Sequence, residues 1–258
     1  MARDMTESPL RDHPCGGYRF LPGIDPYSCG VIAAPGHEIV HATLAQPLPW
    51  HEGLIRIRRH LEGVGKKRQS LCGVELRCPE PHSMAGFIAF NQKYCALLED
   101  WDMIVDDCNP LARTNVAPVD EAPEETLVHA FSYSEPSEAE RPTFVVAGAG
   151  ELLEGTLVED GIVRSGETGQ DALVEKARYV VEVMQGRMTG LGASPEFLTT
   201  LDVYTAHPLH RILANVITPG LPPAARLGVH WFHSRPPVAD IEFEMDMRGV
   251  QRELVVDL

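Results

Sequence analysis

The chain has 258 residues, 44% of them hydrophobic, which is enough for one large domain or for two domains of about 100 to 150 residues each. Its formal net charge of −15 argues against nucleic acid and anionic membranes as partners, since both attract basic surfaces. No apolar run reaches the length of a membrane span, and the charged first residues do not resemble a signal peptide, so we expect a soluble, cytoplasmic protein.

The N-terminal segment differs from the rest of the chain. Residues 1–24 are rich in proline, glycine and charge and show no periodicity, which predicts an irregular N-terminal arm. Two strands are predicted next, over residues 25–32 and 38–45, and the turn Pro35-Gly36 between them indicates a hairpin.

Helical spacing of apolar residues predicts two helices in the first half. The first covers residues 51–64 and ends near Gly65. A strand follows over residues 71–77. Ser83 can cap the second helix, which has one apolar face and ends at the acidic turn 100–107.

Two further strands, over residues 113–119 and 126–133, complete the first half. The first begins with Arg113 in the segment RTNVAPV, which has the pattern of a buried strand, and an altered copy recurs around Arg226. An arginine stays charged and carries five N–H donors, so its burial is costly without an anion. One such arginine is usually solvated or ion-paired. Two at corresponding places favour a carboxylate-binding site.

A charged segment that contains two prolines, residues 135–142, is typical of a linker. The order of predicted elements then repeats: a strand over 144–152, a hairpin-like segment over 157–163, a helix whose apolar face runs from Leu173 to Met184, a strand over 197–205, a helix over 209–217, and strands over 226–233 and 240–247. In the last strand, acidic and apolar residues alternate, with Glu242, Glu244 and Asp246 on one side.

Each half therefore has the order β-β-α-β-α-β-β. This order predicts an α+β fold of two domains, residues 25–134 and 143–258, each with a mixed sheet and two helices on one face. A repeat longer than about 100 residues indicates a duplicated domain rather than a solenoid.

The pattern resembles the Rid family, also called the YjgF-like or reactive intermediate deaminase family, in tandem duplicate. In the first half the resemblance rests on Pro26-Tyr27, on RTNVAPV from Arg113 and on LVHA over 127–130. In the second half it rests on AGEL over 149–152, LDVY over 201–204, Ala225-Arg226 and DIEFE over 240–244. It covers nearly everything from about Asp25 onward.

The resemblance implies two tandem chorismate-mutase-like domains and a homo-oligomer, either a trimer or a pseudo-hexameric arrangement, with active sites in clefts between neighbouring units. It also implies that an arginine holds the carboxylate of a small substrate while a glutamate of the last strand positions water. An imine or enamine is then hydrolysed to a ketone and ammonia without metal or organic cofactor.

Carried onto this sequence, the resemblance places carboxylate clamps at Arg113 and Arg226. Glu242 follows Arg226 at nearly the family spacing, whereas Val128 and His129 stand at the corresponding place of the first half. We therefore predict Arg226 and Glu242 as the catalytic pair. The predicted substrate-binding residues are Arg113, Tyr27, Gly150, Glu151, Gly228, Asn115 and His129.

Other motifs carry weaker signals. All six cysteines lie in the first half without a CxxC pair, so free thiols are expected. His207 and His210 flank a helix start, and His230 and His233 would point to opposite faces of a strand, so we predict no metal site. The glycine-rich segment 148–155 lacks the lysine of a phosphate loop.

Three functions are compatible with these observations. We predict a cofactor-independent hydrolytic deaminase of a small carboxylate-bearing enamine or imine, such as an aminoacrylate-like or aminomuconate-like acid. A chorismatase-like hydrolase of a cyclic enol ether is the first alternative, because chorismatases resemble the same superfamily. A non-catalytic, ligand-sensing oligomer is the second, favoured by the missing glutamate of the first half.

Overall fold

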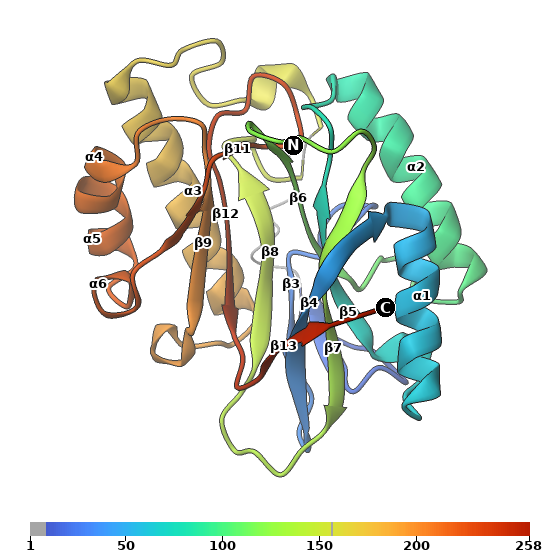
Figure 1. The fold of residues 1–258 in the computed structure, drawn as a ribbon. Helices are drawn as coiled ribbons and strands as arrows, with labels where there is room; N and C mark the ends of the chain where they lie inside the picture. The colour runs from blue at the N-terminus through green and yellow to red at the C-terminus, as the bar shows by residue number, and fades with distance from the viewer. Residues whose placement is uncertain (1–8, 156) are drawn as a thin grey trace.

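The structure, a computed structural model, describes residues 9–155 and 157–258. In this part of the chain two mixed β-sheets lie next to each other in the middle of the molecule, and helices cover their outer sides (Figure 1). The seven-stranded sheet has the order β1-β2-β3-β8-β12-β9-β10, and the six-stranded sheet has the order β11-β6-β5-β7-β4-β13. The fold class is therefore α+β, as predicted.

The strands have the following bounds. The seven-stranded sheet contains β1 (Arg11–Asp12), β2 (Tyr18–Leu21), β3 (Gly30–Ala33), β8 (Phe144–Gly150), β9 (Thr200–Tyr204), β10 (His230–Phe232) and β12 (Glu244–Gly249). The six-stranded sheet contains β4 (His37–Pro49), β5 (Leu71–Arg77), β6 (Ala112–Pro118), β7 (Leu127–Pro136), β11 (Ser234–Arg235) and β13 (Glu253–Val256).

The long helices occupy the positions that apolar spacing predicted. They are α1 (Trp50–Gly63), α2 (Met84–Asp100) and α3 (Gln170–Gly190). Ser83 caps α2 as predicted, since its Oγ accepts the Gly86 N–H at 3.1 Å. The shorter helical segments are α4 (His210–Ile212), the π-helical turn Leu213–Ile217, α5 (Thr218–Gly220), α6 (Ala224–Leu227) and the 3₁₀ turns Arg68–Ser70, Glu159–Gly161 and Pro195–Phe197. Among the described helices, none is long and apolar enough to cross a membrane.

Four apolar clusters form among the described residues, and the three larger ones hold these layers together. One lies between α1, α2 and the six-stranded sheet, with Leu54 and Tyr94 fully buried. A second lies between α3 and the seven-stranded sheet, where Met184 packs near Met245. The third joins the two sheets and includes Phe20. Because apolar burial contributes about 25 cal/mol per Å², these layers stabilise one another.

The two halves have the same strand topology. In the first half the sheet order is β4-β7-β5-β6, and in the second it is β8-β12-β9-β10. In both, the first two pairings are antiparallel and the last is parallel. In both, the helices cover one face of the sheet, as predicted (Figure 1).

The predicted hairpin over residues 25–32 and 38–45 is wrong. β3 pairs with β2 and β8, whereas β4 pairs with β7 and β13, so consecutive strands lie in different sheets. Gly36 has φ of +77°, and its turn carries the chain from one sheet to the other. Two-residue turn signals indicate a reversal, but the partner of each strand depends on which apolar face it buries.

Part of the predicted N-terminal arm is also ordered in strands. Residues 11–12 and 18–21 form β1 and β2, because Tyr18, Phe20 and Leu21 are buried between the sheets or under α3. At the other end, β13 pairs in parallel with β4 of the first half. The sheets therefore do not divide at the predicted linker 135–142, and the domain boundaries stay a prediction.

Three predicted segments of the second half differ from the structure. Residues 226–233 form only the short strand β10, since Pro222 and Pro223 lead into helix α6. The last strand begins at Glu244 rather than at residue 240. Residues 157–163 contain a 3₁₀ turn, Glu159–Gly161, in place of a hairpin.

Candidate active site

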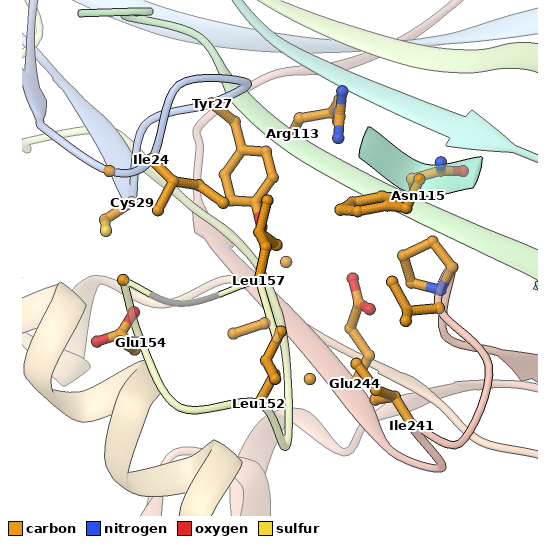
Figure 2. A pocket seen from close by; sticks show the side chains of 18 of the residues that line it. Ile24, Tyr27, Cys29, Arg113, Asn115, Leu152, Glu154, Leu157, Ile241 and Glu244 are labelled. Carbon is orange, nitrogen blue, oxygen red and sulfur yellow. The ribbon is translucent and has the colours of Figure 1, made fainter. Parts of the chain in front are cut away.

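A cavity lies between the two halves, where β6, β8 and β12 come together (Figure 2). Its empty volume is about 720 Å³, the open mouth included. The polar side chains that line it are Tyr27, Arg113, Asn115, Glu154, Arg187 and Glu244, and the larger apolar ones are Ile24, Phe87, Leu152, Leu157, Val238 and Ile241.

Arg113 is the most deeply placed cation of this cavity. Only 3% of its surface is exposed, and its Nη2 donates to Asn91 Oδ1 at 2.7 Å. Its Nη1 has no hydrogen-bond partner among the described residues. Aromatic rings surround the guanidinium, with Cζ 4.8 Å from the ring centre of Tyr94, 5.1 Å from Tyr27, 5.7 Å from Phe87 and 5.8 Å from Phe90. A buried guanidinium with an unused donor is arranged to receive an anion.

Asn115 adds a second unused polar group to the same strand face. It follows Arg113 by two residues on β6, and strand side chains two apart share a face. Neither its Nδ2 nor its Oδ1 has a partner within the described part of the chain, although the residue is only 3% exposed. Unsatisfied buried amides are rare and costly, so this group is placed to bind a ligand that fills the cavity.

Glu244 lies across the cavity from Arg113, at the start of β12 (Figure 2). Burial raises the pKa of this carboxyl to about 8, while Arg187 and Arg113 oppose that shift by favouring the charged form. At neutral pH the group is therefore largely protonated, so it can donate a proton. Acid–base groups with pKa values near the working pH are typical of catalytic sites.

This raised pKa predicts a pH dependence of stability. Because the folded pKa lies above the ordinary value of 4.5, Glu244 contributes stability that is full below about 4.5 and lost as pH rises through about 8. We therefore expect the melting temperature of Glu244→Gln, relative to the parent, to rise between these pH values. Thermal melts of both proteins at closely spaced pH values measure this difference, and a constant difference would contradict the assignment.

Gly148 lets the Glu244 carboxyl take its position. A Cβ at Gly148 would lie 2.4 Å from Glu244 Oε1 and 3.0 Å from Thr114 Oγ1. Only glycine leaves this space free.

We expect Gly148→Ala to displace Glu244 and to lower the free energy of unfolding by about 1–3 kcal/mol. Urea denaturation of the variant and the parent measures the loss. Gly63→Ala is the matched control, since its added methyl group meets nothing within 4 Å. An equal response of the two variants would refute this role of Gly148.

Arg187, from α3, supports the same strand. Its Nη1 donates to the carbonyl oxygens of Ala147 at 3.0 Å and Gly148 at 3.1 Å. Its Nε and Nη2 contact Glu154 Oε1 at 2.8 and 2.7 Å. One edge of this guanidinium thus holds β8, and the other edge faces a carboxylate of the cavity wall.

The structure brings four of the predicted site residues into this cavity: Tyr27, Arg113, Asn115 and Gly150. It places Arg226 elsewhere, exposed on helix α6 rather than in a strand. Gly228 is exposed beside that helix, with φ of +75°. Glu242 is half-buried, and its Oε2 lies 2.8 Å from His207 Nε2. His129 lines neither of these places: it faces Glu75 from β7, and burial lowers its pKa to about 4.

Glu151 was predicted to bind substrate, but its carboxylate is occupied by the protein. Its Oε1 accepts from Lys176 Nζ at 3.0 Å and from the Glu242 N–H at 2.6 Å, and its Oε2 accepts from the Phe243 N–H at 2.9 Å. Both side chains of the ion pair are fully buried. Glu151 therefore fixes the backbone just before β12, which in turn aims Glu244.

We expect Lys176→Met to destabilise the protein by about 3–5 kcal/mol, because it leaves the buried Glu151 carboxylate without its counter-charge. Chemical denaturation gives this value directly. Glu175 lies on the same helix as Lys176. Glu175→Gln breaks its exposed pair with Arg164, which precedes the helix, and should change stability by less than about 1 kcal/mol. A loss of similar size in both variants would show that the buried pair has no special role.

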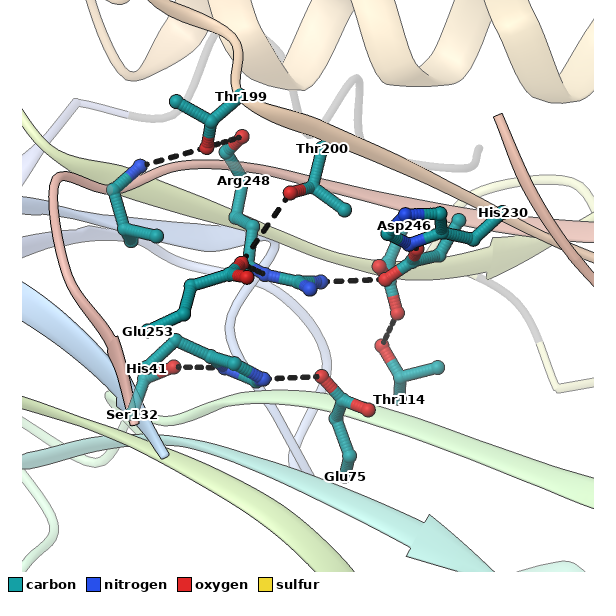
Figure 3. Close-up of polar contacts among 12 residues, drawn as sticks. His41, Glu75, Thr114, Ser132, Thr199, Thr200, His230, Asp246, Arg248 and Glu253 are labelled. Atoms are coloured by element: carbon teal, nitrogen blue, oxygen red, sulfur yellow. Dashed lines mark hydrogen bonds and ion pairs between the residues drawn. The ribbon is translucent and has the colours of Figure 1, made fainter. Parts of the chain in front are cut away.

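A buried polar cluster adjoins the site between the two sheets (Figure 3). The carboxylates of Glu75, Asp202 and Asp246 have oxygens within 4.8 Å of one another, a spacing that a metal ion could use. Arg248 already contacts Asp202 at 2.5 Å, and Arg77 contacts Glu75 at 3.3 Å. These cations neutralise the cluster, so a metal ion would have to compete with them.

Thr114 connects this cluster to the site. It lies between Arg113 and Asn115 on β6, and its Oγ1 donates to Asp246 Oδ2 at 2.6 Å. Burial raises the pKa of Asp246 well above its usual value. The hydrogen bond joins β6 of one half to β12 of the other.

Sequence reasoning missed Glu244, Arg187 and Gly148. Glu244 belongs to the acidic side of the last strand, two residues beyond the predicted Glu242. Gly148 lies in the glycine-rich segment 148–155, next to the residues 149–152 that carry part of the family resemblance, but it is not itself among the predicted site residues. Arg187 lies on helix α3, and nothing in the sequence around it indicates that it belongs to the site.

Fold and site together define an α+β protein whose two halves enclose a cavity that is lined by a buried arginine, Arg113, and a buried glutamate, Glu244. Residues 10–254 match the family model described as 2-aminomuconate deaminase CnbZ, so the chain belongs to this deaminase family. It is 37% identical over 249 residues to the 2-amino-5-chloromuconate deaminase of Comamonas testosteroni, covering 93% of this chain and 96% of that protein.

Two solved structures that match in part are the following. A chorismatase crystal structure matches with a TM-score of 0.47 and 9% identity, over 93% of this chain and 78% of that one. The YjgF gene product of E. coli matches with a TM-score of 0.27 and 14% identity, over 43% of this chain and 81% of that one.

Proposed function

We propose that this protein is a cofactor-independent hydrolytic deaminase of 2-aminomuconate or a close analogue, a dienamine with two carboxylates. The observation that carries this proposal is that one cavity is lined both by a buried arginine with an unused donor and by a buried glutamate whose pKa is raised to about 8. Membership in the 2-aminomuconate deaminase family supports the choice of substrate.

In this proposal Arg113 binds the carboxylate next to the amine-bearing carbon. The free Nη1 supplies a charge-assisted hydrogen bond, and burial strengthens it. The amide of Asn115 orients the amine or the attacking water. The apolar residues Ile24, Leu152 and Ile241 contact the carbon skeleton and exclude bulk water.

Glu244 then acts as both acid and base. As an acid it donates its proton to a dienamine carbon, which converts the enamine to an iminium ion. As a carboxylate it removes a proton from water while the oxygen adds to the iminium carbon, giving a carbinolamine. A proton delivered by Glu244 to nitrogen, and return of the hydroxyl proton to the carboxylate, release ammonia and leave the 2-oxo acid.

We assign to Arg113 and Glu244 the roles that the sequence predicted for Arg226 and Glu242. The cavity takes its lining from both halves of a single chain. Assembly as a homo-oligomer stays a prediction, and this mechanism needs no residue from a second chain.

Incubation with 2-aminomuconate tests the proposal. We expect loss of the dienamine absorbance, one ammonia per substrate, and incorporation of ¹⁸O from labelled water into the oxo group. Release of pyruvate from chorismate without turnover of 2-aminomuconate would favour the cyclic enol ether alternative. Binding without turnover of either compound would favour the ligand-sensing alternative.

A further inference from the structure

The cavity holds a second buried arginine, Arg187, whose outer edge is occupied by a carboxylate of the same chain. Only 6% of Arg187 is exposed, and both it and Glu154 line the cavity. The contacts from Nε and Nη2 both go to one oxygen, Glu154 Oε1. A carboxylate bound through both oxygens makes a stronger, bidentate pair with a guanidinium.

We infer that Arg187 is the subsite for the second carboxylate of a dicarboxylate substrate, and that this carboxylate displaces Glu154. The inference rests on the proposed function, because it requires that Arg113 holds the first carboxylate. Glu154 thus occupies in the free protein the place that the far end of the substrate takes in the complex.

The two arginines line one cavity together with Glu244. Both guanidinium charges act on Glu244 and on Tyr27, so these two side chains lie within the field of both cations. A diacid held at its two ends by Arg113 and Arg187 would pass its carbon chain over Glu244. A single-carboxylate ligand would leave the Arg187–Glu154 pair intact.

The exchange requires movement of one side chain only. The N–H of Glu154 donates to Tyr179 Oη at 3.1 Å, and the same hydroxyl donates to the Leu152 carbonyl at 3.2 Å. Arg187 is anchored on its other edge by the carbonyls of Ala147 and Gly148. The backbone on both sides is therefore fixed, while the half-buried Glu154 side chain can rotate toward solvent.

Binding of two unreactive probes, adipate and hexanoate, tests this subsite by calorimetry at pH 7.5. Adipate is a chain of six carbons with a carboxylate at each end, and hexanoate is a chain of the same length with one carboxylate. We expect adipate to bind the parent at least about tenfold more tightly than hexanoate, because it alone reaches Arg187.

Two variants separate the subsite from a structural ion pair. Glu154→Gln removes the competing charge and should lower the adipate Kd about tenfold while leaving hexanoate within about twofold. Arg187→Lys loses the planar fork and should bring adipate to the level of hexanoate. Glu167→Gln, which removes a carboxylate from an exposed pair with Arg164, is the matched control and should change neither Kd.

Equal affinities of the parent for the two probes, or an unchanged adipate Kd in Glu154→Gln, would overturn the inference. If Arg187→Lys does not fold in thermal melts, the comparison of probes on the parent and on Glu154→Gln still decides. Hexanoate binding to Arg113→Met reports on the first carboxylate site alone. Unchanged hexanoate binding there would refute the proposed function instead, whatever adipate does.

Discussion

Arg113→Met is expected to lower kcat/KM for 2-aminomuconate by about a hundredfold to a thousandfold, the effect of losing a buried charge-assisted pair with the substrate carboxylate. Methionine fills similar space among the surrounding aromatic rings but offers no donor. Steady-state kinetics, with substrate concentrations extended above the parent KM, measure the loss.

The stability of Arg113→Met is not expected to fall with its activity. The free protein holds a buried guanidinium whose Nη1 has no partner in the described chain. Replacing it with an apolar side chain removes that desolvation cost, so the melting temperature is expected to stay equal or to rise. A large fall in both activity and stability would indicate that Arg113 is structural.

Arg226→Met is the matched control for this prediction. Arg226 is exposed on α6 and does not line the cavity, so kcat/KM should stay within about twofold of the parent. The reverse result, with activity lost in Arg226→Met and kept in Arg113→Met, would restore the catalytic pair that the sequence indicated.

Glu244→Gln is expected to lower kcat by about a thousandfold, which is within the usual contribution of a general acid–base group. Glutamine has nearly the same size and can still make hydrogen bonds, but it cannot donate or accept the proton in turnover. KM should stay within a few-fold, because Arg113 still binds the carboxylate. Single-turnover measurements separate the chemical step from binding.

The pH profile of the parent gives an independent check on Glu244. Because the protonated carboxyl starts the reaction, kcat/KM, which reports the pKa values of the free protein, should fall as pH rises through about 8. Glu242→Gln is the control: its carboxylate is half-buried and paired with His207 outside the cavity, so both kcat and the pH profile should stay near those of the parent. A pH profile that shifts in Glu242→Gln would show that Glu242, and not Glu244, is the titrating group.

Local pattern was enough to predict much of the secondary structure. The apolar spacing around Leu54, Ile57 and Leu61 predicted α1, and Ser83 marked the start of α2. The cost of burying an arginine in an apolar strand singled out Arg113, which does line the cavity. These signals depend on neighbours within a few residues, so a single sequence reveals them.

Such local signals do not predict which strands pair with one another. A Pro-Gly turn favours reversal, yet the chain crosses at Gly36 from one sheet to the other, and β13 returns to the sheet of the first half. Pairing is decided by which apolar faces are buried together, and in the pairs β3–β8 and β4–β13 those faces come from segments more than a hundred residues apart.

What the sequence by itself determined about this protein is an α+β fold with repeated element order and a strand that carries a costly buried arginine. Only the tertiary structure decided that Arg113 of one half faces Glu244 of the other. Alternation placed Glu242, Glu244 and Asp246 on one side of a strand and could not choose among them. Glu244 takes the position facing Arg113 for two reasons. Gly148 has no Cβ, which leaves room for the Glu244 carboxyl, and Glu151, which is paired with Lys176, fixes the backbone before the start of β12.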